Sequence, residues 1–136
     1  MLRRSLLSLL ICTGLLSCKD NDPIGPDTIV GTWRLQTVSG RALPYILEEG
    51  GGVKIELTGE TVTLEASRRQ TMVTSFRVTD GGVVSLESIP AAGNYTVNGS
   101  TLLLTFDNDE STYTAILNGD AMTIEDIGLT FVYRRD

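Results

Sequence analysis

Apolar and polar residues alternate with a period of two along most of the chain after Ile29. In residues 53–57, for example, Val, Ile and Leu alternate with Lys and Glu, and Trp33, Leu35 and Thr37 share one face of the first such segment. Thr and Val are frequent in these segments, and no stretch shows the 3.6-residue period of an amphipathic helix. The pattern predicts an all-β fold.

Short turn sequences separate the alternating segments and predict about ten strands. The main turn signals are Thr58-Gly59-Glu60, Asp80-Gly81-Gly82, Asn98-Gly99 and Asn118-Gly119-Asp120. Connections of this length join antiparallel neighbours, because a parallel crossover needs a dozen or more residues. An up-and-down meander leaves two unpaired edges, and closing it into a small barrel of about 8–10 strands removes them.

One segment, Gly40–Gly52, does not follow the alternation. It contains Pro44 and ends in three consecutive Gly residues, which predicts either a lid-like loop or a single helical turn around residues 45–48. The apolar residues Tyr45, Ile46 and Leu47 either cap the mouth of the barrel or anchor the loop.

Residues 1–17 have the layout of a secretory signal peptide. Arg3 and Arg4 precede an apolar run over Leu6–Leu16, which is shorter than the roughly 20 residues of a bilayer span. The ending Leu15-Leu16-Ser17-Cys18 resembles the lipobox of bacterial lipoproteins. That resemblance implies cleavage before Cys18 and a diacylglycerol on its thiol. An ordinary signal peptide and an uncut N-terminal anchor are the alternatives.

These features divide the chain into a signal peptide at residues 1–17, a lipidated Cys with a flexible tether at 18–28, and a folded domain at 29–136. The polar tether would reach on the order of 30 Å when extended. The resemblance to lipoproteins implies attachment to a membrane of the bacterial cell envelope through the N-terminal lipid. The outer membrane is favoured over the inner membrane, and the side on which the domain lies stays open.

The composition excludes several kinds of chemistry. The 136 residues include no His, so no imidazole serves as a base or metal ligand, and two Cys cannot form a four-thiolate zinc site. The net charge is −6, and removal of the signal peptide with Arg3 and Arg4 leaves 9 basic and 17 acidic residues, a balance of −8. So acidic a domain is poorly suited to nucleic acid. We expect a protein that is not an enzyme, with no metal and no cofactor.

Two charged clusters have both a functional and a structural interpretation. Residues 107–110 carry three carboxylates, the kind of ligand that binds calcium, but they lack the spacing of a calcium-binding loop. A solvated hairpin loop is therefore the favoured interpretation. Arg68 and Arg69 are suited to an anionic group, although an exposed turn between two strands is the simpler interpretation.

Three motifs resemble those of the lipocalins, and in particular the short lipocalin-like domains of bacterial lipoproteins. They are Gly31-Thr32-Trp33, then Gly93-x-Tyr95-x-Val97-x-Gly99 followed by Leu102-x-Leu104, and finally Phe131-Val132-Tyr133-Arg134-Arg135. The resemblance implies that Trp33 closes one end of the barrel and that an Arg of the last strand packs over it. Alternation assigns this role to Arg135, with Arg134 as the second choice.

The predicted function is that of a membrane-anchored, non-catalytic lipocalin-like lipoprotein that binds a small hydrophobic ligand or a protein partner in the cell envelope. The alternative is a ligand-free interaction, inhibitor or envelope-assembly module whose barrel core is filled. An eight-stranded barrel is just wide enough for side chains or one small ligand. The expected ligand-binding residues are Leu35, Tyr45, Ile55, Leu57, Leu64, Met72, Phe76, Leu104 and Phe131.

Replacing the lipidated residue tests the lipoprotein prediction. We expect Cys18→Ser to abolish incorporation of radiolabelled palmitate and globomycin-sensitive processing, because only the thiol of Cys18 is placed to receive the lipid. Cys12→Ser serves as the control and should still be labelled, since Cys12 lies within the apolar run. Unchanged labelling of the Cys18→Ser protein would refute the prediction.

Overall fold

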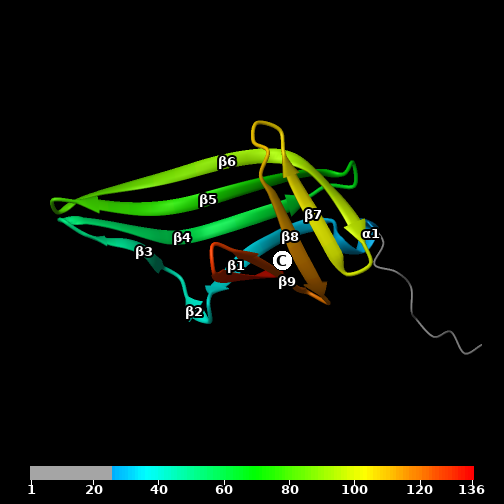
Figure 1. The fold of residues 1–136 in the computed structure, drawn as a ribbon, viewed down its shortest axis with the longest axis horizontal. Helices are drawn as coiled ribbons and strands as arrows, with labels where there is room; N and C mark the ends of the chain where they lie inside the picture. Colours follow the sequence, from blue (N-terminus) through cyan, green and yellow to red (C-terminus); the bar gives the residue numbers. More distant parts are fainter. Residues whose placement is uncertain (1–25) are drawn as a thin grey trace, which may run out of the picture.

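Ten strands and one short helix make up residues 26–136, the part of the chain that the computed structural model describes (Figure 1). The signal peptide, Cys18 and most of the expected tether lie outside these residues. The elements are α1 (Pro26–Ile29), β1 (Gly31–Val38), β2 (Arg41–Ala42), β3 (Tyr45–Gly50), β4 (Val53–Leu64), β5 (Arg69–Asp80), β6 (Val83–Asn98), β7 (Thr101–Phe106), β8 (Thr112–Asn118), β9 (Ala121–Asp126) and β10 (Leu129–Arg135). Within this range, no helix has the length and apolar character needed to cross a bilayer.

The strands form one antiparallel sheet that closes on itself. Consecutive strands from β3 to β10 are neighbours, and β1 pairs with β10 on one side and with β4 on the other. Trp33 therefore lies opposite Arg135 on β10 and opposite Val62 on β4. The closed ring contains eight strands, and β2 and β3 pair outside it. The predicted all-β meander closing into a small barrel is confirmed.

The turn predicted at residues 58–60 is wrong, because β4 continues through this sequence. A β-bulge between Leu57 and Gly59 shifts the register with β5 and adds one residue to β4. The residues on either side of the bulge, Leu57 and Glu60, consequently pair with residues that share one face of β5. The chain reverses instead at residues 65–68, where Arg68 has a φ of +69° and its N–H donates to the carbonyl of Glu65.

A second bulge corrects the predicted face of β1. The register with β10 shifts between Leu35 and Thr37, so the buried side chains of this strand are Trp33, Leu35 and Val38. Thr37 is only half-buried. Simple alternation fails at both bulges because each inserts one residue without a matching residue on the partner strand.

The irregular segment before β4 is neither a lid-like loop nor a helical turn. It forms β2 and β3, and β3 pairs with β4 from Tyr45 opposite Leu57 to Gly50 opposite Val53. Backbone groups on the edge of β4 are available in this region, and strand pairing satisfies them. Tyr45 packs against the core, whereas Ile46 and Leu47 are exposed.

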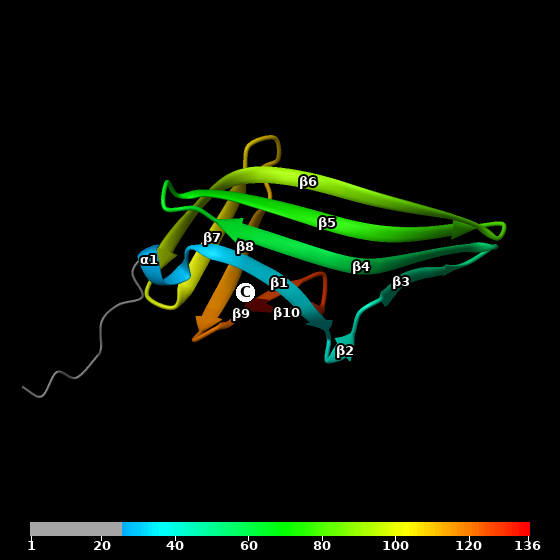
Figure 2. The same ribbon diagram turned by 180° about the vertical axis from the view of Figure 1, so that it is seen from behind.

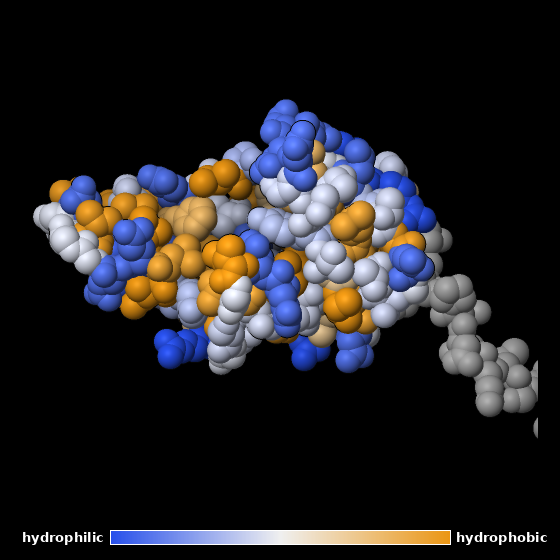
Figure 3. Space-filling model, viewed as in Figure 1, coloured by the Kyte–Doolittle hydropathy of each residue, from blue (hydrophilic) through white to orange (hydrophobic). Residues whose placement is uncertain are grey.

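Strands β4, β5 and β6 extend beyond the barrel and, with β3, form a projecting sheet, the extension (Figures 1 and 2). The pairing of β5 with β6 continues without interruption to Asp80 and Val83 at the far end. Apolar side chains gather over the extension in Figure 3. On the outer face of β4, Glu56 is 4% exposed and lies between Arg77, at 2.7 Å, and Lys54, at 3.2 Å. The Arg77 guanidinium lowers the pKa of Glu56 to about 2.

Gly93 marks the point where β6 enters the barrel. Ladder pairing between β6 and β7 begins here, opposite Phe106. A Cβ atom on Gly93 would lie 1.7 Å from the carbonyl oxygen of Thr105, which in turn accepts a hydrogen bond of 2.9 Å from Nε2 of buried Gln70. The missing side chain therefore permits the close approach of two backbones.

Gly93→Ala tests this close approach. We expect it to lower the free energy of unfolding by roughly 2 kcal/mol or more, because the added methyl group displaces the Thr105 carbonyl from Gln70. Urea denaturation followed by the fluorescence of Trp33 measures the change. Gly59→Ala is the matched control, since its Cβ would meet no atom within 4 Å. Equal stability of the two variants would contradict the packing argument.

Candidate functional site

The two ends of the barrel differ. At the closed end, which carries α1 and the β4–β5, β6–β7 and β8–β9 turns, Trp33 is 1% exposed and its Nε1 donates to the Ile29 carbonyl at 3.0 Å. The Arg135 guanidinium lies 5.8 Å from the Trp33 ring centre and donates to the Thr28 carbonyl. Arg134 is exposed. A cation–π contact of this kind stabilises a fold by about 0.5–2 kcal/mol.

Side chains fill the half of the barrel nearest the closed end. The buried residues there come from most strands of the ring, and they are Val62, Leu64, Tyr95, Leu102, Leu104, Ala115, Leu117 and Met122. The hydroxyl of Tyr95 donates to the Glu65 carbonyl in the β4–β5 turn at 2.5 Å, and Arg68 covers the Tyr95 ring at 5.7 Å. Leu64 and Leu104, expected to bind ligand, are thus placed in the packed core.

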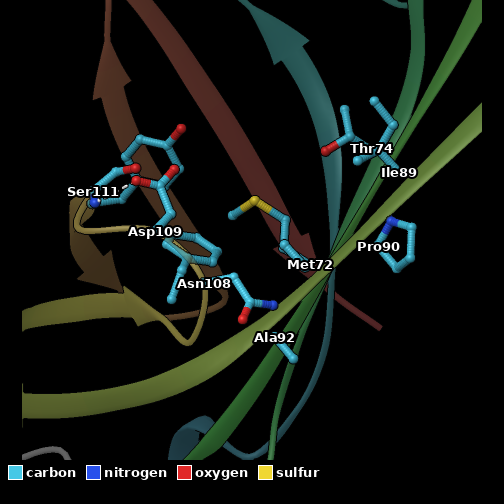
Figure 4. A pocket seen from close by; sticks show the side chains of 11 residues that line it. Met72, Thr74, Ile89, Pro90, Ala92, Asn108, Asp109 and Ser111 are labelled. Atoms are coloured by element: carbon cyan, nitrogen blue, oxygen red, sulfur yellow. Dashed lines mark hydrogen bonds between the residues drawn. The ribbon is translucent and has the colours of Figure 1, made fainter.

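The half of the barrel nearest the open end contains two adjoining cavities. The outer cavity has a volume of about 280 Å³ and lies between the β5–β6 pair and the loop between β7 and β8. Figure 4 shows Met72 projecting between Asp109 and Ser111 of this loop and Ile89 and Pro90 of β6. The remaining lining residues are Thr74, Ala91, Ala92, Phe106, Asn108 and Tyr113.

The inner cavity has a volume of about 110 Å³ and shares Met72, Thr74 and Tyr113 with the outer one. Its other lining residues are Glu60, Ile124, Asp126, Phe131 and Tyr133. The apolar lining is interrupted by a few polar groups, an arrangement typical of small-molecule sites. Each cavity is smaller than the roughly 300 Å³ at which the usual range for such sites begins, and the two adjoining cavities reach that range only together.

The expected ligand-binding residues are divided among three places. Met72 and Phe131 line the cavities. Leu35 and Leu57 are buried with the core, as are the two residues already placed at the closed end. Tyr45, Ile55 and Phe76 are partly buried where the extension begins. Tyr45 on β3 and Phe76 on β5 lie opposite Leu57, and Ile55 lies two residues before it on β4.

Glu60 lines the inner cavity and is partly buried. Its carboxylate accepts hydrogen bonds from the hydroxyl of Tyr133 and, at 2.6 Å, from the hydroxyl of Thr74. Burial raises the pKa of Tyr133 far above its ordinary value, and the charge of Glu60 raises it further. The Tyr133 hydroxyl therefore stays protonated and remains a donor to the carboxylate.

Two further carboxylates line the cavities, Asp126 in the inner one and Asp109 in the outer one. Burial raises the pKa of Tyr113, and the carboxylates of Asp126 and Glu60 add to the effect. The pKa of Asp109 is lowered by hydrogen bonds from the side chain and the backbone N–H of Ser111, the latter at 2.9 Å. Asp109 is consequently ionised at neutral pH.

Sequence reasoning missed much of this lining. Glu60 was assigned to a turn, and only the bulge in β4 reveals that it faces inward. Residues 107–111 do connect β7 to β8 and are largely exposed, as a hairpin loop would be, yet Asp109 lines the outer cavity. Asp107 of the same loop pairs with Arg69 at 2.6 Å, which fixes the loop to β5. Alternation within β8 was the available signal for Tyr113, and alternation within β10 does predict that Tyr133 faces inward with Phe131.

The model of the lipocalin-like domain family matches residues 29–124, from the end of α1 into β9. The chain belongs to the lipocalin-like family. A comparison with curated proteins finds no significant match. In this lipocalin-like domain the plugged closed end and the hollow open end together define one candidate binding site. Among residues 26–136, no group of three acidic or Cys side chains is arranged to hold a metal ion.

Proposed function

We propose that the lipocalin-like domain binds a small, mainly apolar molecule in the two cavities at its open end. The observation that carries this proposal is the division of the barrel into a filled half and a hollow half. Six apolar residues line the outer cavity, namely Met72, Ile89, Pro90, Ala91, Ala92 and Phe106. Burying a ligand against them would be favourable by about 25 cal/mol per Å² of apolar area removed from water.

A binding role is favoured over a catalytic one by the chemistry of the lining. Both lining tyrosines have a raised pKa, so their hydroxyls stay protonated and are poor nucleophiles. Both carboxylate oxygens of Glu60 already accept a hydrogen bond from a hydroxyl group. Within the described part of the chain, the residues lining the two cavities include no Lys, Arg or Cys. These features suit recognition of a ligand better than proton transfer to it.

The proposal places the domain at a membrane of the bacterial cell envelope. A lipid on Cys18 would hold it there through a tether of about ten residues, extended to on the order of 30 Å. More than one acyl chain gives stable anchoring, since each buried methylene contributes about 0.8 kcal/mol. The lipobox-like sequence supports this part of the proposal.

Filling the outer cavity tests the proposed function. We expect native mass spectrometry of the full chain, purified from the cells that make it, to detect a co-purifying small molecule. Ala91→Phe should abolish this adduct, because Ala91 lines the outer cavity and a phenyl group there takes up the space. Ala66→Phe is the control and should retain the adduct, since Ala66 lies exposed in a turn. A bare wild-type mass, or an adduct that persists in Ala91→Phe, would contradict the proposal.

Protein interaction is a second candidate function, and the edge of β6 favours it. The carbonyl of Ala92 accepts from Asp107 next to β7, while the N–H of Tyr95 donates to Arg68 next to β5. Even-numbered residues of β6 therefore direct their backbone groups away from β5. Between residues 83 and 91, no strand of the described chain pairs with that side.

A second copy of the chain fits this edge. Antiparallel pairing centred on Leu86 would place Val83 opposite Ile89 and Ser85 opposite Glu87, so that no like charges meet. Val83 is 72% and Leu86 is 78% exposed. Long exposed apolar edges of this kind are sites of strand addition.

Charge substitution on the edge tests the second function. We expect the full chain to sediment as a dimer in a density-matched detergent and Leu86→Lys to sediment as a monomer, because two Lys side chains would meet at the centre of the pairing. Ile116→Lys is the control, since Ile116 is 50% exposed on β8 and lies away from the edge. A wild-type monomer at all concentrations would exclude the pairing.

A further inference from the structure

The charges around the two cavities are all of one sign. Glu60 and Asp126 line the inner cavity and Asp109 lines the outer one, whereas no Lys or Arg of residues 26–136 lines either. None of these carboxylates takes part in an ion pair among residues 26–136. Glu56 on the extension is different, because Arg77 and Lys54 compensate its charge.

Aromatic side chains form the second feature of the cavities. The sequence contains 1 Trp, 4 Tyr and 3 Phe, and half of these eight aromatic residues line the two cavities. They are Phe106, Tyr113, Phe131 and Tyr133. Phe106 and Tyr113 meet edge to face, with ring centres 5.5 Å apart and planes at 78°. The faces of such rings are electron-rich and attract cations, quaternary ammonium groups above all.

The two cavities also differ in their balance of apolar and charged groups, since Asp109 in the loop is the one carboxylate among the described residues that line the outer cavity. The outer cavity offers Ile89, Pro90 and Phe106 as an apolar wall, whereas Glu60 and Asp126 lie around the inner cavity. A ligand with a charged head and an apolar body can therefore place each part against matching chemistry. An anionic head, such as a fatty acid carboxylate, would meet three carboxylates and no cation.

We propose that the ligand of this site is a small cationic amphiphile, an amine or quaternary ammonium compound whose apolar body lies in the outer cavity. The head group lies among the aromatic rings and the carboxylates of Glu60 and Asp126. This inference rests on the proposed ligand-binding function and specifies the charge of its ligand. The bulge in β4 contributes directly, because it turns Glu60 into the barrel.

Three probes that share a benzyl group test the charge preference: benzyltrimethylammonium, benzyl alcohol and phenylmethanesulfonate. Isothermal titration of the full chain in lipid nanodiscs, with empty nanodiscs as the blank, gives the affinity of each. We expect the cation to bind at least ~10-fold more tightly than the alcohol, and the sulfonate to bind more weakly than the alcohol. Equal binding of the three probes would overturn the charge assignment and leave the proposed ligand-binding function standing. Binding of none would overturn both.

A matched pair of variants locates the effect. Asp126→Asn should weaken binding of benzyltrimethylammonium by roughly 5-fold or more and leave benzyl alcohol unchanged, because it removes one charge beside the head group. Glu125→Gln removes the same charge from the neighbouring exposed residue, which lines neither cavity, and should change binding by less than about 2-fold. An equal loss of benzyltrimethylammonium affinity in both variants would mean that the preference for cations comes from the net charge of the domain. That result would overturn the assignment of the head group to this site.

Discussion

The pairing of β1 with both β10 and β4 is the constraint on which the rest of the structure depends. A sheet of short strands leaves unsatisfied backbone groups at both edges, and this pairing joins the edges into a ring. Because β1 occupies the seam, its inward residue Trp33 is held between the first and the last parts of the domain. Arg135 and α1 then cover the indole. The strand pairing that closes the barrel therefore also places the side chains that fill its closed end.

The closed end of the barrel is packed with side chains, whereas the open end contains cavities. The ring is filled by apolar side chains near Trp33, and the two bulges then change which residues face inward. Beyond them, β4, β5 and β6 are longer than the remaining strands of the ring and continue as the extension. The hollow part of the barrel lies where β6 turns from β7 at Gly93, because no strand fills the space beside residues 83–91. The candidate binding site and the unpaired edge of β6 thus share one cause, the unequal length of neighbouring strands.

Most of the fold was predictable from local patterns. Alternation identified the strands, the Gly-containing turns at residues 81–82, 98–99 and 118–120 identified most reversals, and short connections implied antiparallel order. The errors fall at the bulges and at β3. In the sequence, a bulge only interrupts the alternation of apolar and polar residues, and a turn interrupts it in the same way. The sequence around Gly59 is an example. The strand β3 forms because the edge of β4 provides hydrogen-bond partners for its backbone. The sequence of β3 itself contains no signal of this pairing.

The sequence by itself determined the class of fold, the acidic balance, the lack of imidazole chemistry and the lipobox-like ending at Cys18. These properties depend on residue type and local period, and each can be read within a few residues. Only the tertiary structure decided which carboxylates and aromatic rings line the same two adjoining cavities. Glu60, Asp109 and Asp126 come from a bulged strand, a loop and a strand end that are up to 66 positions apart in the chain. Their proximity depends on register and closure, and a shift of one residue would turn each strand-borne side chain to the opposite face.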